Sequence, residues 1–191
     1  MFSRKRLTIF FIVVLMTAVG FSAFAQAVAT DLIGVTITVD AIALIKVSGS
    51  DLTFAVESPG AAAAGELPVV NDSNTPTYIQ YTSVVASGAR KIDVKASAAL
   101  PAGLKLNIRA GTPTGHGGVG TPVAGGVMVD STGPTTDQTI ITGISSCATG
   151  SGGTQGPAIY YTLSIDEATF GSLTTAGASG ITLTYTLTAN S

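Results

Sequence analysis

Apolar and polar residues alternate along much of the chain, and this alternation predicts short β-strands. The clearest run lies near the C-terminal end, where Ile181, Leu183, Tyr185 and Leu187 alternate with threonines. Similar runs lie at residues 35–39, 52–56, 79–82, 92–95, 104–109, 127–129 and 161–165. Because successive side chains of a strand point to opposite faces, each run can bury one face and expose the other. Gly, Pro, Asn, Asp and Ser separate the runs, so the pattern predicts about nine to eleven short strands.

Helical periodicity is missing from the chain after residue 25. Ala61–Ala64 favours a helix by composition but lies between Gly60 and Gly65 and is too short to be stable. Asp166–Phe170 is expected to form one helical turn between strands. No repeat of fixed period is visible, which excludes solenoids and propellers. We therefore predict an all-β fold, an immunoglobulin-like antiparallel β-sandwich.

Two stretches are so rich in glycine that we expect loops there. They are Gly111–Gly126 and Gly143–Gly156. Such a stretch either lengthens a strand connection at little entropic cost or forms a surface loop that carries function. Both interpretations stay open at this stage.

The first 25 residues are typical of an export signal. Arg4, Lys5 and Arg6 precede the apolar run Leu7–Val19, and Ala23-Phe24-Ala25 supplies small residues for cleavage before Gln26. A second small-residue site would start the mature chain at Val28. The alternative is an uncleaved anchor, because the uncharged run from residue 7 to residue 25 can just span a bilayer. We predict a signal peptide over residues 1–25 and a single β-sandwich domain over residues 26–191. The mature chain would have no membrane span and would be secreted or lie in the cell envelope, in the periplasm, on the outer surface or outside the cell.

Charge and composition exclude several classes of function. Removal of the signal leaves six of the nine Lys and Arg residues against eleven Asp and Glu, and no Lys or Arg follows Arg109. Nucleic-acid binding needs a basic face, so we expect no nucleic-acid partner. One His, one Cys and no Trp leave no internal disulfide and few ways to build a metal site or a sugar-stacking platform.

The motifs that suggest chemistry are weak in this context. Gly115–Gly120 matches the GxGxxG pattern, but a dinucleotide site needs a helix after it, and Pro122, Gly125 and Gly126 argue against one. His116 could act as a base only beside an activated Ser145 or Cys147 and an orienting carboxylate. Residues 143–147 lack the final Gly of the nucleophile elbow. We expect His116 to be an exposed loop residue.

Cys147 is expected to be buried at a strand end, with an intermolecular disulfide as the alternative. Asn71–Asn74 and Asp166-Glu167 offer oxygen ligands, but neither has the spacing of a calcium loop, and turns use the same residue types. We therefore assign no catalytic, metal or cofactor-binding residue and expect no cofactor.

The chain resembles secreted bacterial β-sandwich proteins of the fimbrial-subunit and spore-coat-U-like kind. The shared features are the signal peptide, the early strand Asp51–Phe54 and the closing run Ile181–Leu187. Three further stretches look like those of other exported bacterial proteins: Tyr78–Ser83, Leu100–Leu104, and Ile140–Ile144 with Cys147. The resemblance implies an exported sandwich that is assembled on the cell surface, and it transfers no functional residue to this chain.

The expected function is that of an exported, non-enzymatic structural or adhesive module, such as a fimbrial-type subunit. The alternative is a secreted or envelope binding module that recognises a glycan or peptide through the Gly-rich loops. Self-association or a surface partner would use strand addition, through Ile181–Leu187 or the similar run Val35–Val39. We expect Ile181–Leu187 to dock in its own sandwich, against an N-terminal or central strand.

Overall fold

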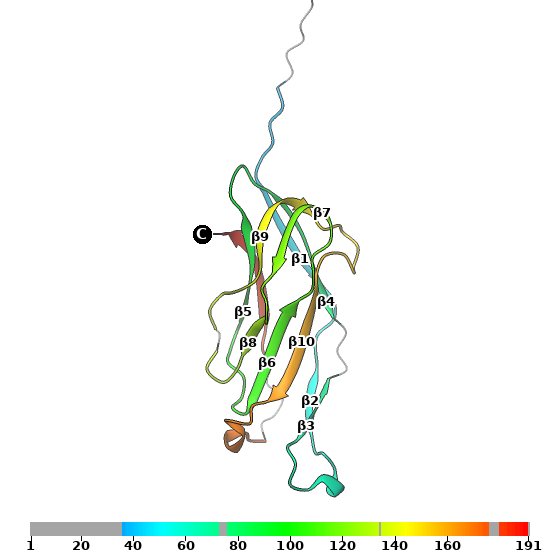
Figure 1. The fold of residues 1–191 in the computed structure, drawn as a ribbon, viewed down its shortest axis with the longest axis vertical. Coiled ribbons are helices and arrows are strands. Elements are labelled where there is room, and N and C mark those ends of the chain that lie inside the picture. The colour runs from blue at the N-terminus through cyan, green and yellow to red at the C-terminus, as the bar shows by residue number, and fades with distance from the viewer. Residues whose placement is uncertain (1–35, 73–75, 134, 176–179, 191) are drawn as a thin grey trace, which may run out of the picture. The chain divides into compact units, whose positions relative to one another are not determined.

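The computed structural model describes residues 36–72, 76–133, 135–175 and 180–190. The predicted signal peptide, residues 1–25, lies outside the described residues. Contacts divide the chain into two units, and the unit Val39–Ser191 contains every strand (Figure 1). The account below concerns this unit.

The described residues form eleven strands, which confirms the all-β prediction. They are β1 (Ile42–Ser48), β2 (Phe54–Glu57), β3 (Val69–Asp72), β4 (Thr77–Val84), β5 (Arg90–Ala96), β6 (Leu104–Ala110), β7 (His116–Pro122), β8 (Val127–Val129), β9 (Gln138–Ala148), β10 (Ala158–Ile165) and β11 (Leu183–Ala189). The helical segments in these residues are two short 3-10 turns, η1 (Ala61–Ala63) and η2 (Phe170–Ser172). The sequence predicted a helical turn at Asp166–Phe170, and η2 begins at Phe170, the last residue of that segment.

The strands pair antiparallel throughout and form a sandwich. One layer has the order β1-β4-β10-β6-β8, and the other has the order β11-β5-β9-β7. The layers are joined where β4 pairs with β9, at Thr82↔Ala148 and Ser83↔Cys147. β2 and β3 form a separate two-stranded hairpin that lies beside β10 (Figure 1).

The core lies between the two layers and is built mainly from isoleucine. Ile79 and Ile108 of one layer and Ile92 and Ile141 of the other are fully buried. The β-branched side chains suit strands because they pack well on a pleated surface. Ile79, Ile92 and Ile108 belong to the alternating runs of the sequence, so the pattern identified the buried face of β4, β5 and β6. Ile141 lies in β9, for which no alternating run was predicted.

A chain of three hydroxyl groups crosses this core. The Thr77 hydroxyl lies 2.8 Å from the Tyr161 hydroxyl, which lies 2.7 Å from the hydroxyl of Tyr185 on the other layer. Burial raises the pKa of Tyr185, and the neighbouring Tyr161 raises it further. Both tyrosines therefore stay neutral and link β4, β10 and β11 by hydrogen bonds.

The strand predicted at Val35–Val39 is not observed. Its described part, residues 36–39, is exposed and lies outside any strand, and β1 begins at Ile42. The register explains the difference, because Ile42 pairs with Val84, the last residue of β4. Residues 39–41, which precede β1 in the same unit, therefore have no residue of β4 opposite them and pair with no described strand. Alternation predicts that a segment can form a strand, but it does not show whether a partner strand lies beside that segment.

The two Gly-rich stretches are also more ordered than expected. The first contains β7, and the second contains the last part of β9, against which β7 pairs. The glycines permit a close approach of the two strands, because a Cβ added at Gly117 would lie 2.2 Å from the Ser146 carbonyl oxygen. Gly120 is similar, with 2.7 Å to the Thr142 carbonyl oxygen. Glycine here serves close strand packing rather than a flexible loop.

β11 docks in its own sandwich, as expected for Ile181–Leu187. It pairs with β5 over seven residues, from Leu183↔Ala96 to Ala189↔Arg90. Ile181, Leu183, Tyr185 and Leu187 pack against the core. β5 is a central strand of its layer, with β9 on its other side.

Candidate functional site

The segment between β9 and β10 makes a protruding loop on the edge of β4. Before the loop, the Thr149 backbone N–H donates to the Tyr81 carbonyl oxygen, and after it the Ile79 N–H donates to the Pro157 carbonyl oxygen. Residues 150–156 therefore leave the sheet between two anchored ends. Gly156 is needed at the return, because its φ is +81° and an added Cβ would lie 2.1 Å from the Ile79 carbonyl oxygen.

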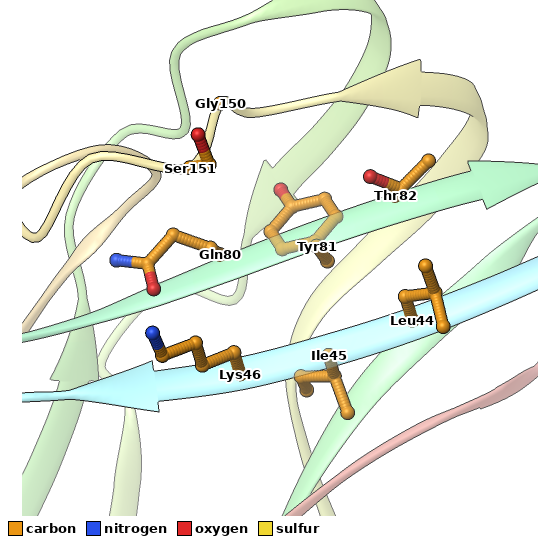
Figure 2. A pocket seen from close by; sticks show the side chains of 8 residues that line it. All are labelled: Leu44, Ile45, Lys46, Gln80, Tyr81, Thr82, Gly150 and Ser151. Carbon is orange, nitrogen blue, oxygen red and sulfur yellow. The ribbon is translucent and has the colours of Figure 1, made fainter.

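A hollow of about 210 Å³ lies between this loop and strands β1 and β4. Figure 2 shows its lining, which comes from Leu44, Ile45 and Lys46 of β1, Gln80, Tyr81 and Thr82 of β4, and Gly150 and Ser151 of the loop. The hollow is smaller than pockets for drug-sized ligands, which span roughly 300–1,000 Å³. It therefore suits one sugar ring or one side chain of a larger ligand.

Gln80 is the polar side chain that defines this hollow. It is only 6% exposed, and its amide nitrogen donates to the Ser48 hydroxyl at 2.8 Å and to the Gln155 carbonyl oxygen at 3.1 Å. The Ser48 hydroxyl in turn donates to the Gly153 carbonyl oxygen at 2.7 Å. These contacts fix the amide orientation, because a flipped amide would put its oxygen against the Gln155 carbonyl oxygen. The amide oxygen has no hydrogen-bond partner in the described residues.

The side chains that line the hollow are of kinds that can bind a ligand. In Figure 2 the Gln80 oxygen lies on the side of Lys46, and its nitrogen is turned away. Lys46 makes no ion pair within the described residues, and Leu44 beside it is 63% exposed. The Tyr81 hydroxyl donates to the Val119 carbonyl oxygen of β7, and burial raises the pKa of Tyr81. Lys46 and Leu44 are thus free to contact a ligand, and the Gln80 amide oxygen is a buried acceptor without a partner in the described residues.

The free edge of β1 is a second candidate surface. β1 pairs with β4 along one edge over all seven residues, and no other described strand pairs with its opposite edge. Ile45 faces the core, whereas Ile42 and Leu44 are 37% and 63% exposed. β11 of the other layer lies near β1 without pairing with it. An apolar edge with unpaired backbone groups is a template for another strand.

His116 and Cys147, two of the residues considered for nucleophilic catalysis, are not brought together on one face. His116 is exposed as the first residue of β7 rather than in a loop, and it pairs with Ala148, whereas Gly117 pairs with Cys147. Neighbouring residues of a strand point to opposite faces, so His116 and Cys147 lie on opposite faces of the β7–β9 pair. Cys147 is 8% exposed near the end of β9, where we expected it to be buried, and burial raises the pKa of its thiol. A neutral, buried thiol is a poor nucleophile.

The acidic turn after β10 serves the local structure. The Asp166 carboxylate accepts hydrogen bonds from the Thr169 hydroxyl at 2.8 Å and the Ala168 N–H at 3.2 Å, and it forms an ion pair with Lys105 at 2.7 Å. These contacts lower the pKa of Asp166, with the Lys105 hydrogen bond as the largest cause. The second acidic stretch, Asn71–Asn74, lies partly outside the described residues. Within the described ranges, no group of three or more His, Cys, Asp or Glu side chains could hold a metal ion.

Part of the hollow was visible in the sequence and part was not. Gly150 and Ser151 belong to the Gly-rich stretch that we considered as a binding loop, whereas Gln80 gave no signal beyond its polar place in an alternating run. No helix of the described residues is long and apolar enough to cross a bilayer. No family of proteins, no curated protein and no solved structure matches the chain.

Proposed function

We propose that the chain is an exported, non-enzymatic structural or adhesive protein of the bacterial cell surface. The observation that carries the proposal is the free edge of β1, with Leu44 63% exposed on it. Proteins that stay monomeric protect such edges with charges, bulges or covering loops. Here Lys46 is the one charged residue of the strand. The placement of His116 and Cys147 on opposite faces of the β7–β9 pair supports a non-enzymatic role.

Assembly would proceed by addition of a strand from a neighbouring copy to β1. β11 is already paired along β5, so the donor is the alternating segment Val35–Val39, whose described residues pair with no strand. Backbone hydrogen bonds would supply affinity, and alternate side chains would supply register.

The test is the size of the purified mature chain by light scattering as concentration rises. Leu44→Lys places a charge on the acceptor edge and Ile37→Lys places one in the donor, so each variant should reduce the assembled fraction. Thr184→Lys is the matched control, because Thr184 is exposed on β11, the edge strand of the other layer. Unchanged assembly in both Leu44→Lys and Ile37→Lys would contradict strand addition at β1.

Export is tested separately by mass spectrometry of the protein from the envelope or the medium. A chain that begins at Gln26, or at Val28, supports the signal peptide. An intact Met1 in the membrane fraction would instead show the uncleaved anchor.

A second candidate function is recognition of a glycan or peptide at the hollow. The buried Gln80 amide oxygen without a partner favours it, because buried acceptors ordinarily find a donor. Titration of oligosaccharides and short peptides by NMR would test this candidate. Binding that is lost in Gln80→Met and kept in Gln155→Met, which leaves the Gln155 carbonyl in place, supports it.

A further inference from the structure

Charge is separated between two parts of the fold. The layer β1-β4-β10-β6-β8 carries Lys46, Lys105 and Arg109 and no acidic residue in its strands. The β2–β3 hairpin with its connections, residues 49–72, carries four acidic residues and no Lys or Arg. The acidic residues are Asp51, Glu57, Glu66 and Asp72.

The basic part holds an exposed patch of the composition that protein interfaces favour. Arg109 pairs with Tyr160, and its guanidinium lies 5.8 Å from the centre of that ring. Asn107, two residues before Arg109, pairs with Met128, so the alternation places Met128 on the same face. Tyr160 and Met128 are 45% and 44% exposed. We call Arg109, Met128 and Tyr160 the aromatic–basic patch, since Tyr, Arg and Met are enriched in interfaces.

The hairpin holds a patch of opposite charge. Glu57 pairs with Val69, so both lie on one face of the hairpin, and Val69 is 49% exposed. Phe54 lies on the other face and packs against the core of the sandwich. Glu66 and Leu67 are exposed in the connection just before β3. We call Glu57, Glu66, Leu67 and Val69 the acidic hairpin patch.

The charged side chains of the two patches have no ion-pair partner within the described part of the molecule. Lys105 is already paired with Asp166, but Arg109, Glu57 and Glu66 form no ion pair there. Each patch thus combines exposed apolar side chains with charge of one sign. The complement of each patch is present on the same chain.

We propose that the acidic hairpin patch of one copy docks on the aromatic–basic patch of a second copy. Leu67 and Val69 would cover Tyr160 and Met128, and the glutamates would pair with Arg109. The contact joins two different surfaces, so copies can link head to tail into a ring or a filament. It rests on the assembly in our proposed function, but it uses surfaces other than the free edge of β1.

The experiment measures self-association of the purified mature chain by sedimentation velocity at low and high salt. Arg109→Glu and the double variant Glu57→Arg/Glu66→Arg should each weaken association by about tenfold or more, and the triple variant that combines them should restore it. Matched controls are Lys95→Glu on β5 and Asp137→Lys before β9, both at exposed positions outside the two patches. High salt should weaken the wild-type contact, since it screens exposed charges.

The possible results separate this proposal from the strand-addition proposal. Restored association in the triple variant supports docking of the two patches. Association that Leu44→Lys abolishes and charge reversal leaves unchanged overturns patch docking and keeps strand addition. Association that charge reversal weakens and Leu44→Lys leaves unchanged supports patch docking and overturns strand addition. A wild-type chain that stays monomeric at every concentration overturns both.

Discussion

The close contact between β7 and β9 makes Gly117→Ala the most informative substitution for stability. Gly117 has φ +81°, and its added Cβ would lie 2.2 Å from the Ser146 carbonyl oxygen and 3.1 Å from the Cys147 Cα. Both atoms belong to the backbone, so no side-chain rotation relieves the clash. The new side chain must push β7 away from β9.

The magnitude follows from two costs. A non-glycine residue in this left-handed conformation costs about 1–3 kcal/mol. Overpacking against fixed neighbours adds about 1–3 kcal/mol. Gly117→Ala should therefore lower the free energy of unfolding by about 2–6 kcal/mol, a large part of the roughly 5–15 kcal/mol typical of a domain.

Gly143→Ala is the matched control. Gly143 lies on β9 itself and has φ +73°, but nothing lies within 4 Å of its added Cβ. This variant carries the conformational cost without the clash and should lose about 1–3 kcal/mol. The difference between the two variants thus isolates the packing of β7 on β9.

The assay is urea unfolding followed by tyrosine fluorescence and circular dichroism, because the chain has five Tyr and no Trp. A Gly117→Ala chain that fails to fold while Gly143→Ala folds agrees with the argument. Equal losses in the two variants would refute it, since the β7–β9 contact would then carry no packing cost.

Three further substitutions test the core and the charges. Cys147→Ser should cost about 1–3 kcal/mol in unfolding free energy, because it buries a hydroxyl without a sure partner, and a quantitative covalent dimer on a non-reducing gel would contradict burial of the thiol. Tyr185→Phe should cost about 0.5–1.5 kcal/mol by urea unfolding, since it removes the hydrogen bond to Tyr161 across the layers. Lys105→Met should flatten the loss of stability in acid. The reason is that the lowered pKa of Asp166 contributes stability that is complete above the ordinary carboxyl pKa of about 4 and is lost as pH falls through the folded-state pKa. An unchanged acid profile would count against that ion pair.

Alternation in the sequence determined the strands that have one buried face. In β6, Leu106 and Ile108 are buried and Arg109 is exposed, as the period-two pattern requires. The same pattern identified the inward face of β11. These predictions succeed because burying an apolar side chain is worth about 1.5–3 kcal/mol wherever the strand finds its partner.

Strand partners were decided by the tertiary structure alone. Residues 36–39 alternate as well as any strand, yet β4 ends at Val84 and leaves them without a partner. β7 has almost no apolar side chains to signal a strand, and it forms because its glycines allow β9 to approach closely. Neither outcome can be predicted from a local sequence pattern, because each depends on a segment distant in the chain.

The candidate sites also have features that the sequence predicted and features that only the tertiary structure decided. Composition predicted a Gly-rich loop at residues 143–156, and residues 150–156 form a loop whereas residues 143–148 belong to β9. The hollow depends on where the loop leaves the sheet, and that is set by the hydrogen bonds of Thr149 and Pro157 to β4. Gln80 becomes a buried acceptor without a partner only because those two anchors place the loop over it.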